Sequence, residues 1–222
     1  MEINDSCVLV SSDLEAAYAR LEIWFAECSG AIVAFSGGVD SSLVAFLARR
    51  FLGKEEVLGV ISASASLKLS DLDAGKAFCV ENDLPLRVVR TGELLNPDYF
   101  SNPSNRCYFC KSTLYEKLDP LLSEFPGSWI LNGTNLDDLG DYRPGLEAAN
   151  EHRVRSPLSE CGLGKSLVRE MARSFDLECW DKPASPCLSS RIPYGQQVTE
   201  AKLRRIEEAE AWLDKLGFPV CR

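Results

Sequence analysis

The sequence predicts an α/β fold in which a parallel sheet is followed by a mostly helical C-terminal part. Short apolar runs of strand length alternate with longer segments of helical period through most of the 222-residue chain. Strands that alternate with helices need crossover connections, which favours a parallel sheet with helices on both faces. Beyond about residue 144 only helical patterns continue. We therefore predict an α/β domain over residues 1–144 and a helical region over residues 145–222.

The expected elements follow one another in a regular order. The first helix covers residues 14–28, and the apolar run "AIVAF" at 31–35 predicts the first strand. The other expected strands are 57–62, 86–91 and 129–133, and the other expected helices are 41–52, 71–82, 108–124, 145–151, 164–175 and 199–217. Pro97 and Pro103 indicate an irregular segment before the helix at 108. Ligands of parallel sheets bind beyond the carboxyl ends of the strands, so we expect the site there.

Composition limits the classes of partner. An apolar content of 45% is enough for a sizeable core, and the net charge of −9 argues against a long nucleic acid as the main partner. No apolar run reaches the roughly 18 residues that cross a bilayer, and the start of the chain lacks the pattern of an export signal. We expect a cytoplasmic protein without a membrane partner.

A glycine turn between the first strand and its helix predicts a phosphate site. In "SGGVDSS", residues 36–42, Gly37 and Gly38 allow the backbone to approach a ligand closely, and the helix start presents amide donors. Ser36 and Ser41 add hydroxyl groups, and Asp40 can hold a Mg²⁺ ion that bridges phosphates. An ordinary helix-capping turn is the alternative.

This turn differs from the Walker A loop, which has a lysine after its second glycine. The string "GLGKS" at 162–166 also fails as a Walker A loop, because Ser159 stands where the first glycine is required. We interpret "GLGKS" as the start of a helix.

Nine cysteines without an export signal favour metal binding, redox chemistry or packing over structural disulfides. We expect Cys28, Cys79 and Cys179 to be packing residues. Cys107 and Cys110 form a C-x-x-C pair at a helix start, where the dipole favours thiolates.

Three interpretations of the C-x-x-C pair stay open. It could bind zinc together with His152, form a redox pair, or simply pack. In a fourth interpretation, the proline-rich loop around Cys187 folds back over the sheet edge. Cys107, Cys110 and Cys187 then hold a [4Fe-4S] cluster in which one iron has no protein ligand.

The string SGGVDS after an apolar strand resembles the PP-loop of the ATP pyrophosphatase superfamily, whose fold is adenine nucleotide alpha hydrolase-like. This resemblance implies that the chain binds ATP with Mg²⁺ and transfers AMP to a substrate oxygen. A nitrogen or sulfur nucleophile can then displace the AMP.

The combination of SGGVDS, "GTNLDDLGDYRPG" at 133–145, "CLSSRIPYG" at 187–195 and "LGFP" at 216–219 resembles the LarE-type ATP-dependent sulfur transferases. These enzymes help build the nickel-pincer nucleotide cofactor. Cys107 and Cys110 place the chain in the branch with a three-cysteine iron-sulfur cluster. The implied reaction converts a carboxylate of pyridinium-3,5-biscarboxylic acid mononucleotide into a thiocarboxylate, with sulfur from a cluster-bound sulfide or from a sacrificed Cys187.

The LarE resemblance also implies roles for individual residues, which we take as predictions. The predicted ATP-binding residues are Ser36, Gly37, Gly38, Asp40, Ser41 and Gly133, and the predicted cluster ligands are Cys107, Cys110 and Cys187. The predicted substrate-binding residues are Asp141, Arg143, Ser190, Arg191, Glu210 and Arg222. Catalytic roles are expected for Cys187, Asp40 and Arg191. Arg143 is equally interpreted as a solvated or helix-capping residue, and Glu210 as one more acid of "EEAEA".

Relatives of the LarE type continue beyond "LGFP" into a small unit, so a missing C-terminal unit is one expectation for this chain. The resemblance implies a homo-oligomer and a small nucleotide substrate. The alternative functions are a transfer RNA thiolase, an ammonia-dependent adenylating ligase and a nucleotide-binding regulatory module without catalysis.

Overall fold

The computed structural model describes residues 11–140 and 142–218. Within this part of the chain, four strands form one parallel sheet: β1 (Ala31–Phe35), β2 (Val57–Ser62), β3 (Leu86–Val89) and β4 (Trp129–Leu131). Their order is β3-β2-β1-β4, and every pair is parallel. The predicted α/β fold with a parallel sheet is therefore confirmed.

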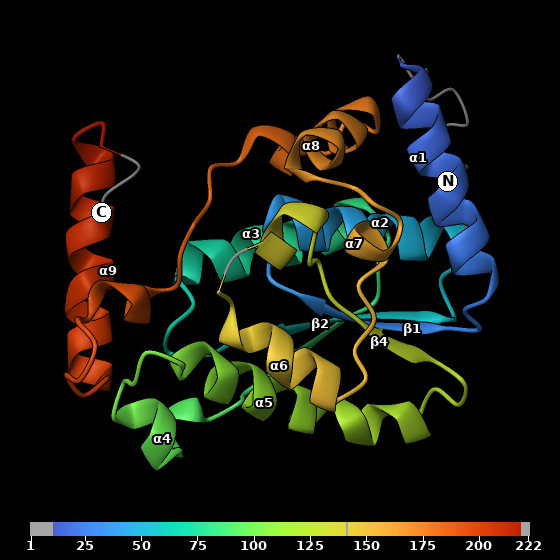
Figure 1. Cartoon of the computed structure of the whole chain (residues 1–222). Helices are drawn as coiled ribbons and strands as arrows, with labels where there is room; N and C mark the ends of the chain where they lie inside the picture. Colours follow the sequence, from blue (N-terminus) through green and yellow to red (C-terminus); the bar gives the residue numbers. More distant parts are fainter. Residues whose placement is uncertain (1–10, 141, 219–222) are drawn as a thin grey trace.

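Helices cover both faces of the sheet (Figure 1). The face drawn uppermost carries α1 (Ser12–Ala26), α2 (Val39–Leu52), α3 (Leu69–Glu81), α7 (Pro157–Glu160) and α8 (Lys165–Ser174). The opposite face carries α4 (Pro97–Phe100), α5 (Arg106–Leu118) and α6 (Pro144–Glu151). Short 3₁₀ turns lie at Glu93–Leu95, Asp119–Ser123, Leu136–Gly140, Glu178–Asp181 and Leu188–Arg191.

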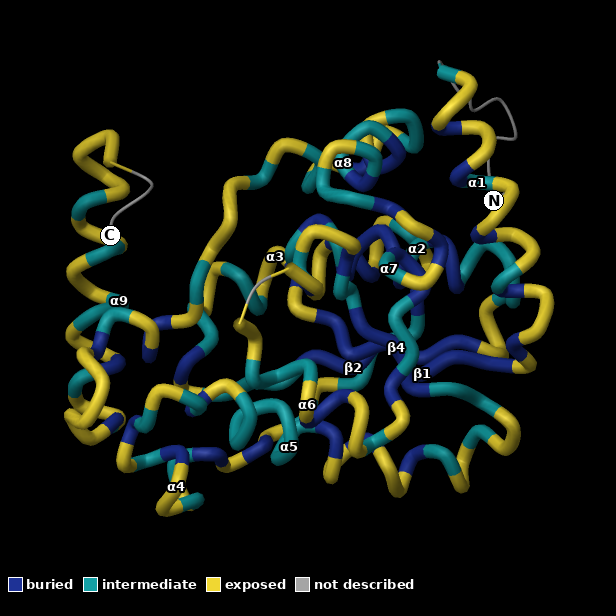
Figure 2. Tube along the Cα trace, viewed as in Figure 1, coloured by how far each residue is buried: buried dark blue, intermediate teal, exposed yellow. Residues whose placement is uncertain are grey.

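Alternation along β1 divides the core into two layers. Val33 and Phe35 pack with α1, α2 and α8, whereas Ile32 and Ala34 pack with α5 and α6. All five residues of β1 are buried, as expected for the central strand of a covered parallel sheet. In Figure 2, β1 and β2 are drawn almost wholly as buried, whereas β3 at the edge of the sheet is only partly buried.

The helices after residue 144 complete both layers. Ala148 and Ala149 of α6 belong to the layer that contains α5, and Leu158 and Val168 of α7 and α8 belong to the layer that contains α1 and α2. Residues before and after 144 thus contribute to both core layers. The division into residues 1–144 and 145–222 stays a prediction.

The last helix, α9 (Glu200–Lys215), lies beside the main body and is largely exposed (Figures 1 and 2). It is attached through a small third cluster in which Leu203 packs with Tyr99, Leu188 and Ile192. No helix among the described residues is long and apolar enough to cross a membrane.

Candidate functional site

The glycine turn after β1 leads directly into α2, as predicted. Gly37 has a φ of +71°, which glycine adopts without steric cost. Gly38 is the N-cap of α2, and no side chain among the described residues caps this helix. The first amides of α2 are therefore free to bind an anion.

Two serines brace the turn from inside. The Ser36 amide donates to Ser41 Oγ at 3.1 Å, and the two hydroxyl oxygens lie 3.0 Å apart. Ser41 Oγ also donates to the Gly38 carbonyl at 3.1 Å. These contacts stabilise the conformation of the turn.

Gly133, two residues after the end of β4, packs against the start of α2. A Cβ atom at this position would lie 2.5 Å from the Ser41 nitrogen and 2.8 Å from its Cα. Any side chain at position 133 would displace the start of α2, so the close approach requires glycine. Its role in ATP binding stays a prediction.

Asp40 is held by residues from two distant segments. Its Oδ1 accepts from Asn135 Nδ2 at 3.1 Å, and its Oδ2 is 2.5 Å from Lys165 Nζ. Lys165 is the first residue of α8, and its backbone amide donates to Asp137 Oδ2 at 2.7 Å. The interpretation of "GLGKS" as a helix start is correct, but the lysine of that string also belongs to the site.

A second lysine contacts the turn from the late loop. Lys182 Nζ donates to the Gly37 carbonyl at 3.2 Å and lies 3.0 Å from Asp71 Oδ1. Arg169 holds this segment by donating to the carbonyls of Trp180 and Lys182, each at 2.8 Å. Sequence reasoning missed Lys165 and Lys182, because neither stands within a phosphate-binding motif.

The three predicted cluster cysteines lie at two element starts. Cys107 and Cys110 stand in the first turns of α5, and Cys187 is the N-cap of the 3₁₀ turn Leu188–Arg191. Cys107 and Cys187 are exposed, and all three are free thiols. Cys187 Sγ lies 3.1 Å from Ser189 Oγ.

The pKa of Cys110 differs from the expectation that a helix start favours the thiolate form. Burial raises the pKa of its thiol to about 12, although the Lys111 ammonium opposes this rise. The charges of Cys187 and Cys107 raise the pKa further, which indicates that the three sulfurs are electrostatic neighbours. Burial therefore outweighs the favourable charge of Lys111 at this thiol.

Two adjoining cavities bring the glycine turn and the thiols together. One has a volume of about 530 Å³ and is lined by Ser36, Asp40, Lys165, Lys182 and Cys187. The other has a volume of about 470 Å³, and Ser36, Asp40, Cys107, Lys111 and Gly133 are among its lining residues. Because Ser36, Asp40 and Arg143 line both cavities, an anion on the glycine turn would have a thiol on each side.

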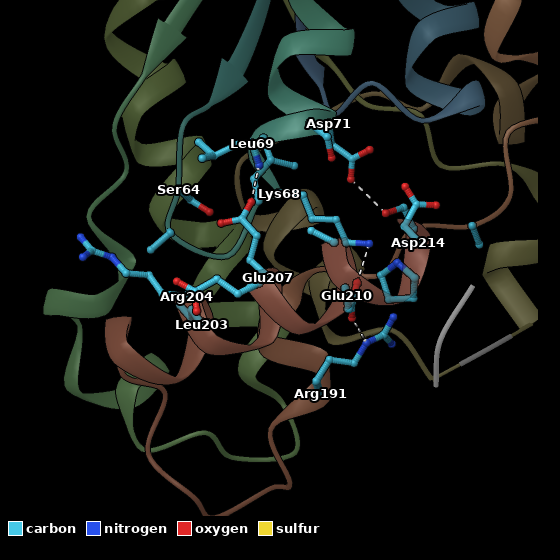
Figure 3. A pocket seen from close by; sticks show the side chains of 18 of the residues that line it. Ser64, Lys68, Leu69, Asp71, Arg191, Leu203, Arg204, Glu207, Glu210 and Asp214 are labelled. Atoms are coloured by element: carbon cyan, nitrogen blue, oxygen red, sulfur yellow. Dashed lines mark hydrogen bonds and ion pairs between the residues drawn. The ribbon is translucent and has the colours of Figure 1, made fainter. Parts of the chain in front are cut away.

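A third cavity, of about 1100 Å³, lies between α9 and the start of α3 (Figure 3). Here Glu210 forms two ion pairs, to Lys68 Nζ and to Arg191 Nε, both at 2.6 Å. Burial alone would raise the pKa of Glu210, but its hydrogen bonds from Lys68 and Arg191 outweigh burial and lower it. The cavity shares Lys68, Asp71 and Lys182 with the 530 Å³ cavity, so the three cavities adjoin in a row.

The other predicted substrate residues vary in placement. Arg191 and Glu210 are brought together, and Arg143 pairs with Asp138 at 2.8 Å while lining the two cavities at the glycine turn. Ser190 Oγ donates to the Cys187 carbonyl at 2.7 Å, so this hydroxyl braces the late loop. Asp141 and Arg222 lie outside the described residues.

The donor set fits an iron-sulfur cluster chemically, since Cys107, Cys110 and Cys187 are free thiols and two of them, Cys107 and Cys187, line the cavities at the glycine turn. Within residues 11–140 and 142–218, however, no three histidine, cysteine or acidic side chains already surround a metal position. Binding a cluster would require the three sulfurs to move together.

This combination of parallel sheet, glycine turn and adjoining cavities defines an enzyme of the PP-loop ATP pyrophosphatase class. A family model described as NAD synthase matches residues 16–94. The NMN synthetase of Francisella tularensis has the same fold, with a TM-score of 0.64 over 96% of this chain and 98% of its own, at 16% identity.

Sequence relatives identify the family within this class. The chain is 35% identical to the pyridinium-3,5-bisthiocarboxylic acid mononucleotide synthase of Lactiplantibacillus plantarum, over 86% of this chain and 69% of that enzyme. It therefore belongs to the LarE family of sulfur-transferring PP-loop enzymes. It is also 44% identical to an uncharacterized protein of Synechocystis, over 94% of this chain and 78% of that protein.

Proposed function

We propose that this protein uses MgATP to convert a carboxylate of pyridinium-3,5-biscarboxylic acid mononucleotide into a thiocarboxylate. The observation that carries the proposal is that Ser36 and Asp40 of the glycine turn line two adjoining cavities, one of which is also lined by Cys187 and the other by Cys107. The similarity to a named bisthiocarboxylic acid mononucleotide synthase supports the choice of substrate.

In the first step, a substrate carboxylate oxygen attacks the α-phosphorus of ATP, and pyrophosphate leaves. The free amides of α2 and the ammonium groups of Lys165 and Lys182 would bind the phosphates. Asp40 would bind the Mg²⁺ ion once Lys165 has moved to the phosphates. The product is an acyl adenylate beside the thiols.

In the second step, a sulfur nucleophile attacks the acyl carbon, AMP leaves, and a thiocarboxylate forms. A [4Fe-4S] cluster on Cys107, Cys110 and Cys187 would supply this sulfur as sulfide on the iron that lacks a protein ligand. The ion-paired Arg191 and Glu210, in the adjoining cavity, would bind the polar end of the nucleotide. The homo-oligomeric state and the cytoplasmic location stay predictions.

The test is anaerobic purification followed by a turnover assay with MgATP, sulfide and the biscarboxylate nucleotide. We expect about four iron atoms per chain, as a [4Fe-4S] cluster requires. We also expect mass spectrometry to detect exchange of a carboxylate oxygen for sulfur, together with AMP and pyrophosphate. Cys187→Ala should abolish the sulfur step. The control Cys161→Ser should not, because the Cys161 thiol contacts the Arg20 carbonyl and lines neither cavity at the glycine turn.

The same assay distinguishes the two sulfur sources. Loss of hydrogen sulfide from the Cys187 peptide after one turnover would show that this cysteine gives up its own sulfur. Reconstituted protein that contains no iron would eliminate the cluster, and absence of a thiolated product with intact ATP cleavage would overturn the proposed reaction.

A further inference from the structure

Two buried polar residues next to the C-x-x-C pair have no part in the steps above. Asn102 has no exposed surface, and Arg106 is only 3% exposed. Both precede or begin α5, the helix that carries Cys107 and Cys110. Buried polar side chains without hydrogen bonds are costly, so their partners indicate what they do.

Arg106 connects the start of α5 to the late loop. Its Nη1 donates to Asn102 Oδ1 at 2.5 Å and to the Ser189 carbonyl at 2.9 Å. Its guanidinium group also lies over the Tyr194 ring, 5.9 Å from the centroid. Arg106 thus contacts the loop at Ser189 and at Tyr194, which stand two and seven residues after Cys187.

Asn102 extends this connection along the same loop. Its Nδ2 donates to the carbonyls of Ile192 at 3.2 Å and Pro193 at 2.8 Å, and its own carbonyl accepts from the Gly195 amide at 2.9 Å. Asn102 has a φ of +58°, in the left-handed region that asparagine tolerates better than most residues. This backbone conformation directs one side chain toward two loop carbonyls.

A separate contact holds the loop directly after Cys187. The Leu188 amide donates to the Ser66 carbonyl at 2.9 Å, and Ser66 Oγ lies 2.6 Å from the buried Tyr99 hydroxyl. With Arg106 holding Ser189, the chain is bound at two consecutive residues after the thiol. The position of Cys187 relative to α5 therefore depends on these buried hydrogen bonds.

We propose that Arg106 and Asn102 are positioning residues for sulfur transfer, which hold Cys187 near Cys107 and Cys110. This inference rests on the proposed function. Neither residue lines the cavities at the glycine turn, so ATP binding and adenylation should not depend on them. A small displacement of a reacting group by a remote substitution can cost about a hundredfold in rate.

The experiment compares two partial reactions in the reconstituted protein. Exchange of labelled pyrophosphate into ATP, with the biscarboxylate nucleotide present, measures adenylation, and thiocarboxylate formation measures sulfur delivery. The variants are Arg106→Met, Arg106→Lys and Asn102→Gly. Arg106→Met removes the donors, Arg106→Lys keeps a single charged nitrogen that can donate, and Asn102→Gly suits the positive φ while removing the side chain. The control is Arg49→Met, since Arg49 likewise donates to a distant carbonyl, that of Asp83.

We expect Arg106→Met and Asn102→Gly to slow thiocarboxylate formation by at least about tenfold while changing pyrophosphate exchange less than about twofold. Arg106→Lys should restore part of the loss, and Arg49→Met should leave both reactions unchanged. Hydrogen exchange of residues 188–198 should be faster in the first two variants, and that of residues 36–52 should not change.

Three outcomes would overturn the inference: equal losses in both reactions, normal sulfur delivery in a folded Asn102→Gly protein, or unchanged hydrogen exchange of residues 188–198. Failure of the proposed function would differ, because the wild-type protein itself would then lack substrate-dependent pyrophosphate exchange. In that case, hydrogen exchange of residues 188–198 would still show whether Arg106 and Asn102 hold the late loop.

Discussion

Lys165 and Gly133 both contact the start of α2, but only Gly133 was assigned to the site from the sequence. Gly133 is the last residue of the strand predicted over 129–133, and its role in ATP binding was predicted from the resemblance to LarE-type enzymes. Lys165 reaches Asp40 across 125 positions of sequence, and its own motif fails as a Walker A loop. Motif reasoning finds residues that a local turn brings together, but not those that tertiary packing brings together.

Substitution of Lys165 by methionine tests its part in adenylation. The change removes the cation closest to Asp40 but keeps the backbone amide that bonds to Asp137. We expect kcat/KM for pyrophosphate exchange to fall about a hundredfold, as when one preorganised donor is lost from a transition state. Lys76→Met, in the exposed pair with Asp73, should have no effect. Unchanged exchange in Lys165→Met would show that the lysine only neutralises Asp40.

At the scale of whole elements, sequence patterns succeed where burial is continuous. The predicted bounds of β1 and β2 agree with the structure because both strands are uninterrupted apolar runs. The helix predicted to end at 124 stops at Leu118 and continues as a 3₁₀ turn, since Pro120 has no amide for the helical ladder. Helices α4 and α7 were not predicted, because each is a single turn that begins with proline.

The attachment of α9 gives a prediction at this scale. Glu210 joins the helix to Lys68 and Arg191, and these hydrogen bonds lower its pKa against the effect of burial. A lowered folded-state pKa stabilises the fold above the unfolded value of about 4.3, and this contribution is lost as the pH falls through the folded value. The ion pairs should therefore disappear in acid.

Glu210→Gln should lower the free energy of unfolding by about 1–2 kcal/mol at neutral pH. The difference from the wild-type protein should persist down to about pH 4.3 and shrink below it. Urea unfolding at a series of pH values measures this effect. Glu200→Gln, in the exposed pair with Arg204, should change stability little at any pH. A Glu210→Gln deficit that is independent of pH would contradict the assigned ion pairs.

At the scale of the whole molecule, the row of three cavities joins chemistry from distant parts of the chain. The glycine turn follows β1, the C-x-x-C pair begins α5, and Cys187 lies in the late loop. The rule that ligands bind at the carboxyl ends of parallel strands predicts where the turn lies. It cannot predict the loop position, which depends on buried contacts such as that between Leu188 and Ser66.

This arrangement predicts that ATP shields the exposed thiols. Alkylation requires a thiolate and access, so iodoacetamide should modify Cys107 and Cys187 in the cluster-free protein. Burial raises the pKa of Cys79 to about 12 and that of Cys161 to about 11, so both should stay unmodified at neutral pH. With MgATP at about ten times its Kd, modification of the exposed pair should slow about tenfold, because only the free protein reacts.

Peptide mass spectrometry of protein alkylated with and without MgATP measures both rates separately. A nonhydrolysable ATP analogue should protect equally, since protection requires binding and not turnover. Because each thiol lines a different cavity beside Asp40, protection of both would require the nucleotide to occupy the shared wall. Protection of Cys107 alone would place the nucleotide in the cavity that Gly133 lines. Protection of neither thiol would show that ATP binds away from both cavities and would contradict the proposed site.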